Sequence, residues 1–155
     1  IKLRYQIKFL DNMMEKKVYI AGPLFNDHER DFLEAIAFNL ETEGFKCFLP
    51  HRDLTGVEES ELKTTSMTQK TKNKIFVADL TALRESDLTV ALITGWDIDS
   101  GTSAEIGYSF AQRKPIIGID ASERRFRNLF VEGMITEKVQ NISAIIPAIK
   151  RAFSE

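Results

Sequence analysis

The chain has 155 residues, 43% hydrophobic and 28% charged, a composition ordinary for a soluble globular protein with one core. Its formal charge of −2 gives no bulk attraction to nucleic acid or a membrane surface, and no apolar run approaches the roughly 20 residues of a transmembrane helix. The single cysteine, Cys47, excludes an internal disulfide, so we expect a reducing, cytoplasmic setting.

In chain order, residues 1–16 are interpreted as an N-terminal extension, and residues 17–155 are predicted to form a single domain. Apolar runs bounded by turn residues predict five strands in that domain. They are Lys17–Ala21, Phe45–Leu49, Leu88–Ile93, Ile116–Ile119 and Lys138–Ile142.

Helical periodicity fills most of the intervals between these strands. The expected helices follow a cap at Asn26 or Asp27 and end near Gly44, run from about Met67 to Leu83, run from Ser100-Gly-Thr102 to Arg113, and close the chain over 142–153 with Pro147 inside. Residues 55–65 are expected to form a polar loop, and residues 122–130 to be partly helical.

Strands alternating with helices predict an α/β fold with right-handed crossovers. The expected architecture is a flavodoxin-like, doubly wound, five-stranded parallel sheet of order 2-1-3-4-5, with helices on both faces. Ligands bind such sheets where the strand order reverses, here between the first and third strands. The two segments that meet at this crevice are Ala21–Phe25 and the loop from Asp97 to Glu105.

Three acids, Asp97, Asp99 and Glu105, lie around this strand-to-helix turn. Glu105 falls in the first turns of the predicted helix, where the helix N terminus favours a negative charge, so we expect it to be held ionised. Gly107 is expected to let the helix lie close to the sheet. The alternative is a solvated acidic loop before an ordinary helix.

Other common catalytic and binding motifs do not occur in the sequence. There is no glycine-rich dinucleotide or P-loop motif, no nucleophile elbow, and no partner at metal-ligand spacing for His28 or His51. The remaining candidates are carboxylates, which suit glycosyl transfer without a metal or other cofactor. They are Asp79, Asp97, Asp99 and Glu105.

Four motifs in order resemble the nucleoside 2-deoxyribosyltransferases, from Lys17 to the C terminus. They are Val18-Tyr-Ile-Ala-Gly-Pro-Leu-Phe25, Ala78-Asp-Leu80, Asp99-x-Gly-Thr-x-x-Glu-Ile-Gly107 and Lys114-Pro-Ile116. The resemblance implies exchange of the base of a 2'-deoxyribonucleoside, with retention at C1', through a covalent intermediate on a glutamate.

By this resemblance, Glu105 corresponds to the nucleophile and Tyr19 to the tyrosine that orients it. Asp79 corresponds to the acid that shuttles the base's proton, and Asp99 to the acceptor of the sugar 5'-hydroxyl. Asn128 corresponds to an asparagine that a neighbouring subunit contributes to the site, which implies a homo-oligomer, either a dimer or a hexamer. The implied substrates are deoxyribonucleosides and free bases, and the implied role is purine salvage.

Further substrate contacts are expected along the crevice. Phe25 and Trp96 are candidates to stack on the base, although core packing explains these aromatics equally well, and His51, Arg52 or Asp53 are candidates to read its edge. The remaining candidate contacts are Gly22, Pro23, Asp97 and Gly101.

Two alternatives remain. A related 2'-deoxynucleoside 5'-monophosphate N-glycosidase has serines where this chain has Asp99 and Asn128, and a carboxylate would repel its phosphate, although Ser100, Ser103 and nearby arginines leave an anion site open. The other alternative is a non-catalytic nucleotide-binding sensor on the same fold.

Overall fold

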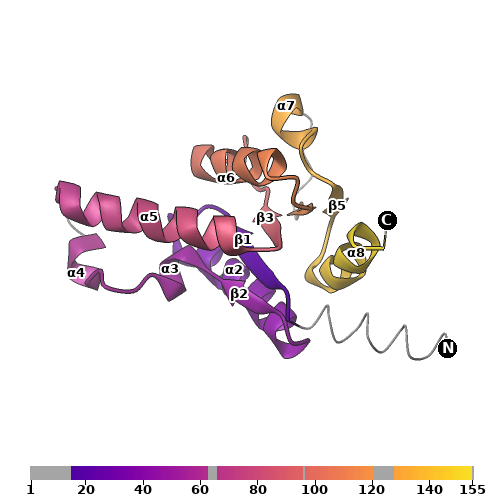
Figure 1. Ribbon diagram of the computed structural model, residues 1–155, viewed down its shortest axis with the longest axis horizontal. Helices are drawn as coiled ribbons and strands as arrows, with labels where there is room; N and C mark the ends of the chain where they lie inside the picture. Colours follow the sequence, from indigo (N-terminus) through magenta and orange to yellow (C-terminus); the bar gives the residue numbers. More distant parts are fainter. Residues whose placement is uncertain (1–14, 63–65, 96, 121–127, 155) are drawn as a thin grey trace.

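The computed structural model describes residues 15–62, 66–95, 97–120 and 128–154 (Figure 1). Expectations for residues 1–14, Trp96 and residues 121–127 lie outside the described residues. The helices and strands are β1 (Lys17–Ala21), α2 (Asp27–Thr42), β2 (Lys46–Phe48), α3 (Pro50–Asp53), α4 (Glu59–Leu62), α5 (Gln69–Glu85), β3 (Leu88–Leu92), α6 (Ser100–Ala111), β4 (Ile116–Ile119), α7 (Leu129–Glu132), β5 (Glu137–Val139), a 3₁₀ turn (Ile142–Ala144) and α8 (Ile145–Ala152).

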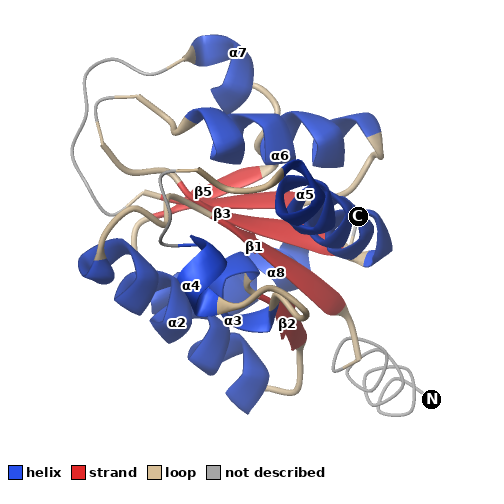
Figure 2. Cartoon of the chain, turned by 90° about the vertical axis from the view of Figure 1, so that its left-hand side faces the viewer, coloured by secondary structure: helices blue, strands red, loops and turns tan. Residues whose placement is uncertain are grey.

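The strands form one sheet in the order β2-β1-β3-β4-β5, and every neighbouring pair is parallel. The predicted order 2-1-3-4-5 is therefore confirmed. Helices cover both faces, with α5 and α6 on one side and α2 and α8 on the other (Figure 2). The reversal of strand order falls between β1 and β3, so the segments that follow these strands share one edge of the sheet.

The two faces of the sheet bury different kinds of side chain. On the α2 and α8 face, Val18 and Ile20 pack with apolar residues of those helices. On the α5 and α6 face, Tyr19 packs with Leu83 and Ile106. All residues of β3 are buried, as expected for a central parallel strand with both faces covered.

The C-terminal part differs from the sequence expectation. β5 ends at Val139, because Asn141 starts a new turn and its side chain accepts a hydrogen bond from the amide of Ala144. Pro147 lies in the first turn of α8, where its missing N–H removes no helical hydrogen bond.

Two other segments also depart from expectation. Within the predicted polar loop, a short helix, α4, forms at Glu59–Leu62. β2 is shorter than predicted, ending at Phe48. Gly44 has a φ of 91° directly after α2, which is the left-handed conformation expected of a glycine that ends a helix.

Candidate active site

Tyr19 stands in the middle of β1 and is fully buried under α5 and α6. Its strand neighbours in register are Phe48 on β2 and Thr89 on β3. The Phe48 ring stacks on the Tyr19 ring with centroids 5.7 Å apart. The Tyr19 ring is therefore held from the side, and its hydroxyl has a defined position above the sheet.

The Tyr19 hydroxyl donates a hydrogen bond of 2.6 Å to Oε1 of Glu105. Glu105 is the sixth residue of α6, in its second turn. This bond joins the first strand to the helix that follows the third strand. The resemblance paired these two residues, and the fold brings them into contact across 86 positions of sequence.

Asp79 on α5 lines the same cavity as Tyr19 and Glu105. The cavity has a volume of about 280 Å³. Among the described residues, Oδ1 of Asp79 is one of the few buried side-chain atoms with no hydrogen-bond partner. A buried acceptor of this kind is costly unless something else supplies a donor, so the arrangement is suited to a ligand N–H or a shared proton.

The remaining lining of the cavity is mostly apolar and was not predicted as a site. The lining residues are Phe76, Leu80 and Leu83 from α5 and Ala104 and Tyr108 from α6. The spacing of positions 76, 80 and 83 places those three side chains on the face of α5 that also carries Asp79, and this periodicity is the signal that could have found them.

Burial dominates the electrostatics of this cavity. It raises the pKa of Glu105 to about 7; the hydrogen bond from Tyr19 acts in the opposite direction, and the charges of Asp79 and Asp99 add to the rise. Burial also raises the pKa of Asp79 to about 6 and, together with the charge of Glu105, raises the pKa of Tyr19.

Contrary to the expectation, its place on α6 does not keep the pKa of Glu105 low. The effect of the N terminus fades beyond the first turn, whereas Glu105 lies in the second turn and is largely removed from water.

Asp99 caps α6, and its Oδ2 accepts a hydrogen bond of 3.1 Å from the amide of Thr102. The cap therefore lies one residue before Ser100-Gly101-Thr102, the segment at which the sequence placed the start of this helix. A Cβ on Gly101 would lie 3.1 Å from the same Oδ2, so glycine leaves room for the carboxylate. Asp97 is exposed and binds the next backbone amide, that of Ile98.

Comparison with known proteins identifies the family of this chain. A protein-family model described as nucleoside 2-deoxyribosyltransferase matches residues 18–144, which is most of the chain. The chain belongs to the nucleoside 2-deoxyribosyltransferase family.

Solved structures agree in fold. A conserved protein from Enterococcus faecalis V583 matches with a TM-score of 0.73 and 22% identity, covering 89% of this chain and 99% of that one. A 2-deoxyribosyltransferase from Bacillus psychrosaccharolyticus matches with a TM-score of 0.70 and 20% identity, covering 83% and 89%. The comparison with curated protein sequences gave no match.

Not every residue expected to contact substrate lines the cavity of this deoxyribosyltransferase-family chain. Gly22 is explained by packing, because a Cβ there would lie 2.7 Å from a methyl carbon of Leu33 on α2. Pro23 is buried, and the side chain of Phe25 is 77% exposed, so packing in the core does not account for Phe25.

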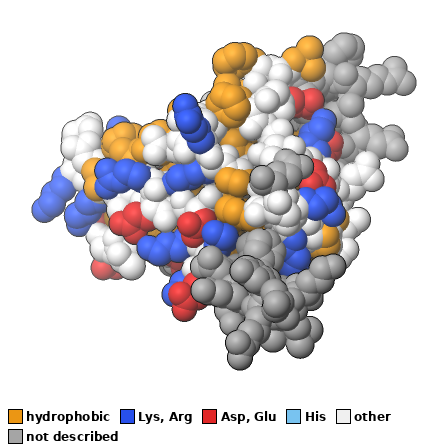
Figure 3. Space-filling model, turned by 45° about the vertical axis from the view of Figure 1, so that its right-hand side comes forward, with side chains coloured by type: hydrophobic (Ala, Val, Ile, Leu, Met, Phe, Trp, Pro, Cys, Tyr) orange, Lys and Arg blue, Asp and Glu red, His pale blue; other side chains and the backbone are white. Residues whose placement is uncertain are grey.

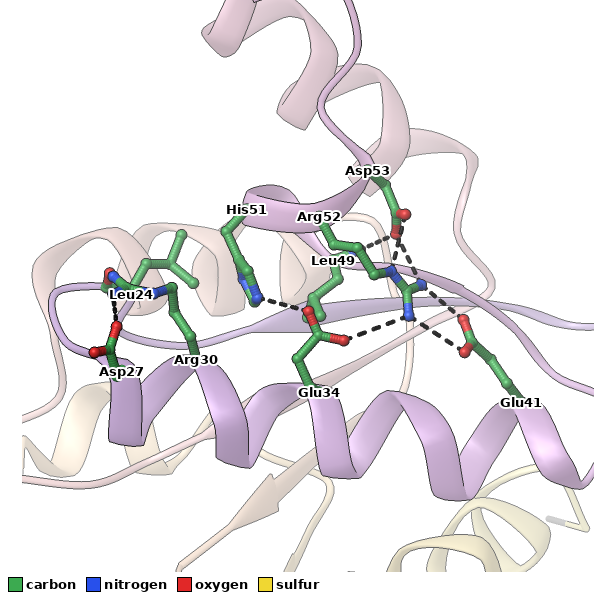
Figure 4. Close-up of polar contacts among 9 residues, drawn as sticks. All are labelled: Leu24, Asp27, Arg30, Glu34, Glu41, Leu49, His51, Arg52 and Asp53. Atoms are coloured by element: carbon green, nitrogen blue, oxygen red, sulfur yellow. Dashed lines mark hydrogen bonds and ion pairs between the residues drawn. The ribbon is translucent and has the colours of Figure 1, made fainter. Parts of the chain in front are cut away.

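His51, Arg52 and Asp53 were candidates to read the base, but most of their polar groups are engaged elsewhere (Figure 4), whereas Nδ1 of His51 is buried without a hydrogen-bond partner. Nε2 of His51 lies 3.0 Å from Oε1 of Glu34. Arg52 pairs with Glu41 at 2.7 Å and with Asp53 at 2.9 Å. His51 and Arg52 attach α3 to α2, and Asp53 binds Arg52 and the amide of Leu49. None of the three lines the cavity around Glu105 in the described part of the chain.

Asn128 and Gly107 also have structural surroundings that the sequence did not indicate. Asn128 caps α7, and its side-chain oxygen accepts from the amides of Phe130 and Val131. A Cβ on Gly107 would meet the sulfur of Met134 at 3.9 Å, so the expected close approach of this residue to the sheet is wrong.

Two further properties concern ions and membranes. The described residues include no cluster of three His, Cys, Asp or Glu side chains arranged to hold a metal ion. Every helix in the described ranges is too short or too polar to traverse a bilayer.

Proposed function

We propose that this protein transfers the 2-deoxyribosyl group between nucleobases. The observation that carries the proposal is the hydrogen bond from the Tyr19 hydroxyl to Glu105 inside a cavity shared with Asp79. Two carboxyl groups of raised pKa in one cavity, one of them oriented by a hydrogen-bond donor, are the pair of acids that glycosyl transfer uses.

In the first step, Glu105 acts as the nucleophile. Because Oε1 accepts the Tyr19 hydrogen bond, we assign the attack to Oε2. A C1'–O bond forms to the carboxylate as the C1'–N bond breaks, and the bond's electron pair stays on the base nitrogen. Asp79 supplies the proton that neutralises the departing base.

In the second step, a different base enters and Asp79 takes its proton. The base nitrogen attacks C1', the bond to Glu105 breaks, and the carboxylate is restored. Two inversions give retention at C1'. Water in place of the second base would release free deoxyribose, so slow hydrolysis is expected.

A free 5'-hydroxyl is the sugar end that we favour. Asp99 adds to the negative potential at Glu105, and the described lining of the cavity contains no lysine or arginine. A phosphate dianion near these carboxylates would be repelled. We assign the 5'-hydroxyl to Asp99, which makes the monophosphate N-glycosidase the alternative to be tested.

We also propose that the active form is a homo-oligomer in which Asn128 completes a neighbour's site. Asn128 does not line its own protomer's cavity, and the adjacent Leu129 and Phe130 are 80% and 77% exposed. Hydrophobic side chains also gather at the top of the face in Figure 3, in the region of α7. Exposed apolar residues of this kind are typical of an interface. The reaction would serve reuse of bases, purines among them, in the cytoplasm.

The experiment is base exchange followed by product chromatography. Deoxyinosine with adenine should give deoxyadenosine and hypoxanthine, and deoxynucleoside monophosphates alone should give little free base. Glu105→Gln should reduce exchange at least about 10³-fold, whereas Glu43→Gln, an exposed glutamate at the end of α2, should not.

Other results would contradict the proposal in distinct ways. Release of base from monophosphates without exchange would identify the glycosidase. Nucleoside binding without turnover, unchanged in Glu105→Gln, would identify a sensor.

A further inference from the structure

Beneath the site, two hydroxyl groups are bonded to each other within an apolar layer. Thr89 Oγ1 on β3 and Ser109 Oγ on α6 lie 2.7 Å apart, and both residues are fully buried. They lie on the face of the sheet where Leu83, Ile106 and Ile116 form the surrounding core. Neither residue lines the cavity.

The geometry relates this pair directly to Tyr19 and Glu105. Tyr19 and Thr89 are partners in register on neighbouring strands, which lie about 4.8 Å apart. Glu105 and Ser109 are four residues apart on α6, so they lie on the same side of the helix. The Tyr19–Glu105 and Thr89–Ser109 hydrogen bonds therefore attach successive turns of α6 to the adjacent strands β1 and β3.

The apolar packing of α6 rests on few large side chains. Its buried side chains are those of Thr102, Ile106 and Ser109, and Tyr108 is partly buried against the same core. By contrast, α2 buries Leu33, Ile36, Ala37 and Leu40. A helix with so few large buried side chains needs directional contacts to define its rotation and its position along its axis.

We propose that Thr89 and Ser109 are positioning residues that hold α6 so that Glu105 meets the Tyr19 hydroxyl. The proposal rests on the function proposed above for Glu105. A buried hydroxyl pair contributes little net stability relative to an apolar pair of the same shape, but its directionality selects one arrangement. The expected cost of losing it is therefore in geometry rather than in folding.

The decisive variant is the double substitution Thr89→Val with Ser109→Ala, because each single change leaves a buried hydroxyl without its partner. Its apparent melting temperature should stay within about 4 °C of the wild type. Its kcat for base exchange at pH 8 should fall about fivefold, with KM within about twofold, because a small misplacement of the nucleophile affects the reaction more than binding.

Two matched variants separate positioning from packing. Thr89→Ser keeps the hydroxyl and should retain kcat within about twofold of the wild type. Thr71→Val removes another buried hydroxyl, one that bonds Thr68 and Glu61 instead, and should leave kcat unchanged.

A second measurement does not depend on turnover. Carbon-13 NMR follows the Glu105 carboxyl against pH, with Glu105→Gln assigning the resonance. The charged or titratable groups near it are Tyr19 from β1, Asp79 from α5, and Asp99 and Tyr108 from the α6 segment. Since the Tyr19 hydrogen bond lowers the pKa of Glu105, the double variant should titrate higher, toward the value in Tyr19→Phe.

An unchanged titration together with unchanged kcat in the double variant would overturn the positioning role. A wild-type protein that neither exchanges nor hydrolyses would refute the proposed function instead, and the titration would still decide whether the pair positions Glu105.

Discussion

Two groups of carboxylates in this protein differ in how their charge is balanced. Between α2 and α3, Glu41 and Asp53 surround the guanidinium of Arg52, with Glu34 3.8 Å away (Figure 4). Hydrogen bonds to Asp53 and Glu41 raise the pKa of Arg52, so this group stays charged throughout the physiological range. These acids hold a short helix in place.

The second group, Asp79 and Glu105, shares a cavity with two tyrosines and with no lysine or arginine among its described lining residues. Burial raises the pKa values of these two carboxyl groups to about 6 and about 7. In this comparison, the carboxylates beside a cation help to join α3 to α2, whereas burial without a cation raises the pKa values of the other two carboxyl groups toward neutral pH.

The largest expected effect is on the proton step. Asp79→Asn keeps the size of the side chain but cannot transfer a proton, so kcat for exchange should fall by about 10² to 10⁴-fold. Bases that leave readily without protonation should be affected least. Steady-state kinetics with a series of purines measures this, with Asp31→Asn, on the exposed side of α2, as the matched control. Equal loss for all bases would contradict a proton-transfer role.

The next effect concerns stability. The pKa of Glu105 rises from 4.5 to about 7 on folding, so its protonated form favours the native state. That stabilisation is complete below about pH 4.5 and is lost as pH rises through about 7, a difference on the order of 3 kcal/mol. Glu105→Gln should therefore be more stable than the wild type at pH 8, and nearly equal to it at pH 4.5, in urea unfolding. A Glu105→Gln variant less stable than the wild type at pH 8 would refute the conclusion that the buried charge of Glu105 destabilises the native state.

In the group around Arg52, a substitution should lower stability and leave the reaction unchanged. Arg52→Ala removes the partner of Glu41 and Asp53 and should lower the free energy of unfolding by about 1 kcal/mol, since these groups are partly exposed. The kcat of the folded protein should not change. Urea unfolding and exchange assays on the same preparation separate the two outcomes, and a lost kcat with intact stability would place Arg52 in the reaction.

The smallest effect is a shift in pH dependence. Tyr19→Phe removes the hydrogen bond that lowers the pKa of Glu105, so the acid limb of the kcat profile should move to higher pH. At pH 8 the loss should be modest, below about tenfold, because most of the carboxylate is then ionised. Asp79→Asn should move the same limb downward, because the charge of Asp79 raises the pKa of Glu105. Equal limbs in all three proteins would show that neither neighbour affects Glu105.

Local patterns were sufficient for much of the fold. The apolar runs at Lys17–Ala21 and Ile116–Ile119 match β1 and β4, and Asn26 caps α2 as expected. Their alternation with helical segments led to the observed strand order, because right-handed crossovers leave few arrangements of a parallel sheet. The short helix α4 and the early end of β5 depended on weaker local signals.

By itself, the sequence determined the alternation of strands and helices, and through it the strand order. The pairing of Tyr19 with Glu105 came from the resemblance to the family, and the structure places it over the middle of β1. Only the tertiary structure decided the protonation behaviour of Glu105 and which acids stand without a cation. The same residue type is paired with Arg52 in one place and buried beside Tyr19 in another, because burial and charge balance arise from side chains that are distant in sequence.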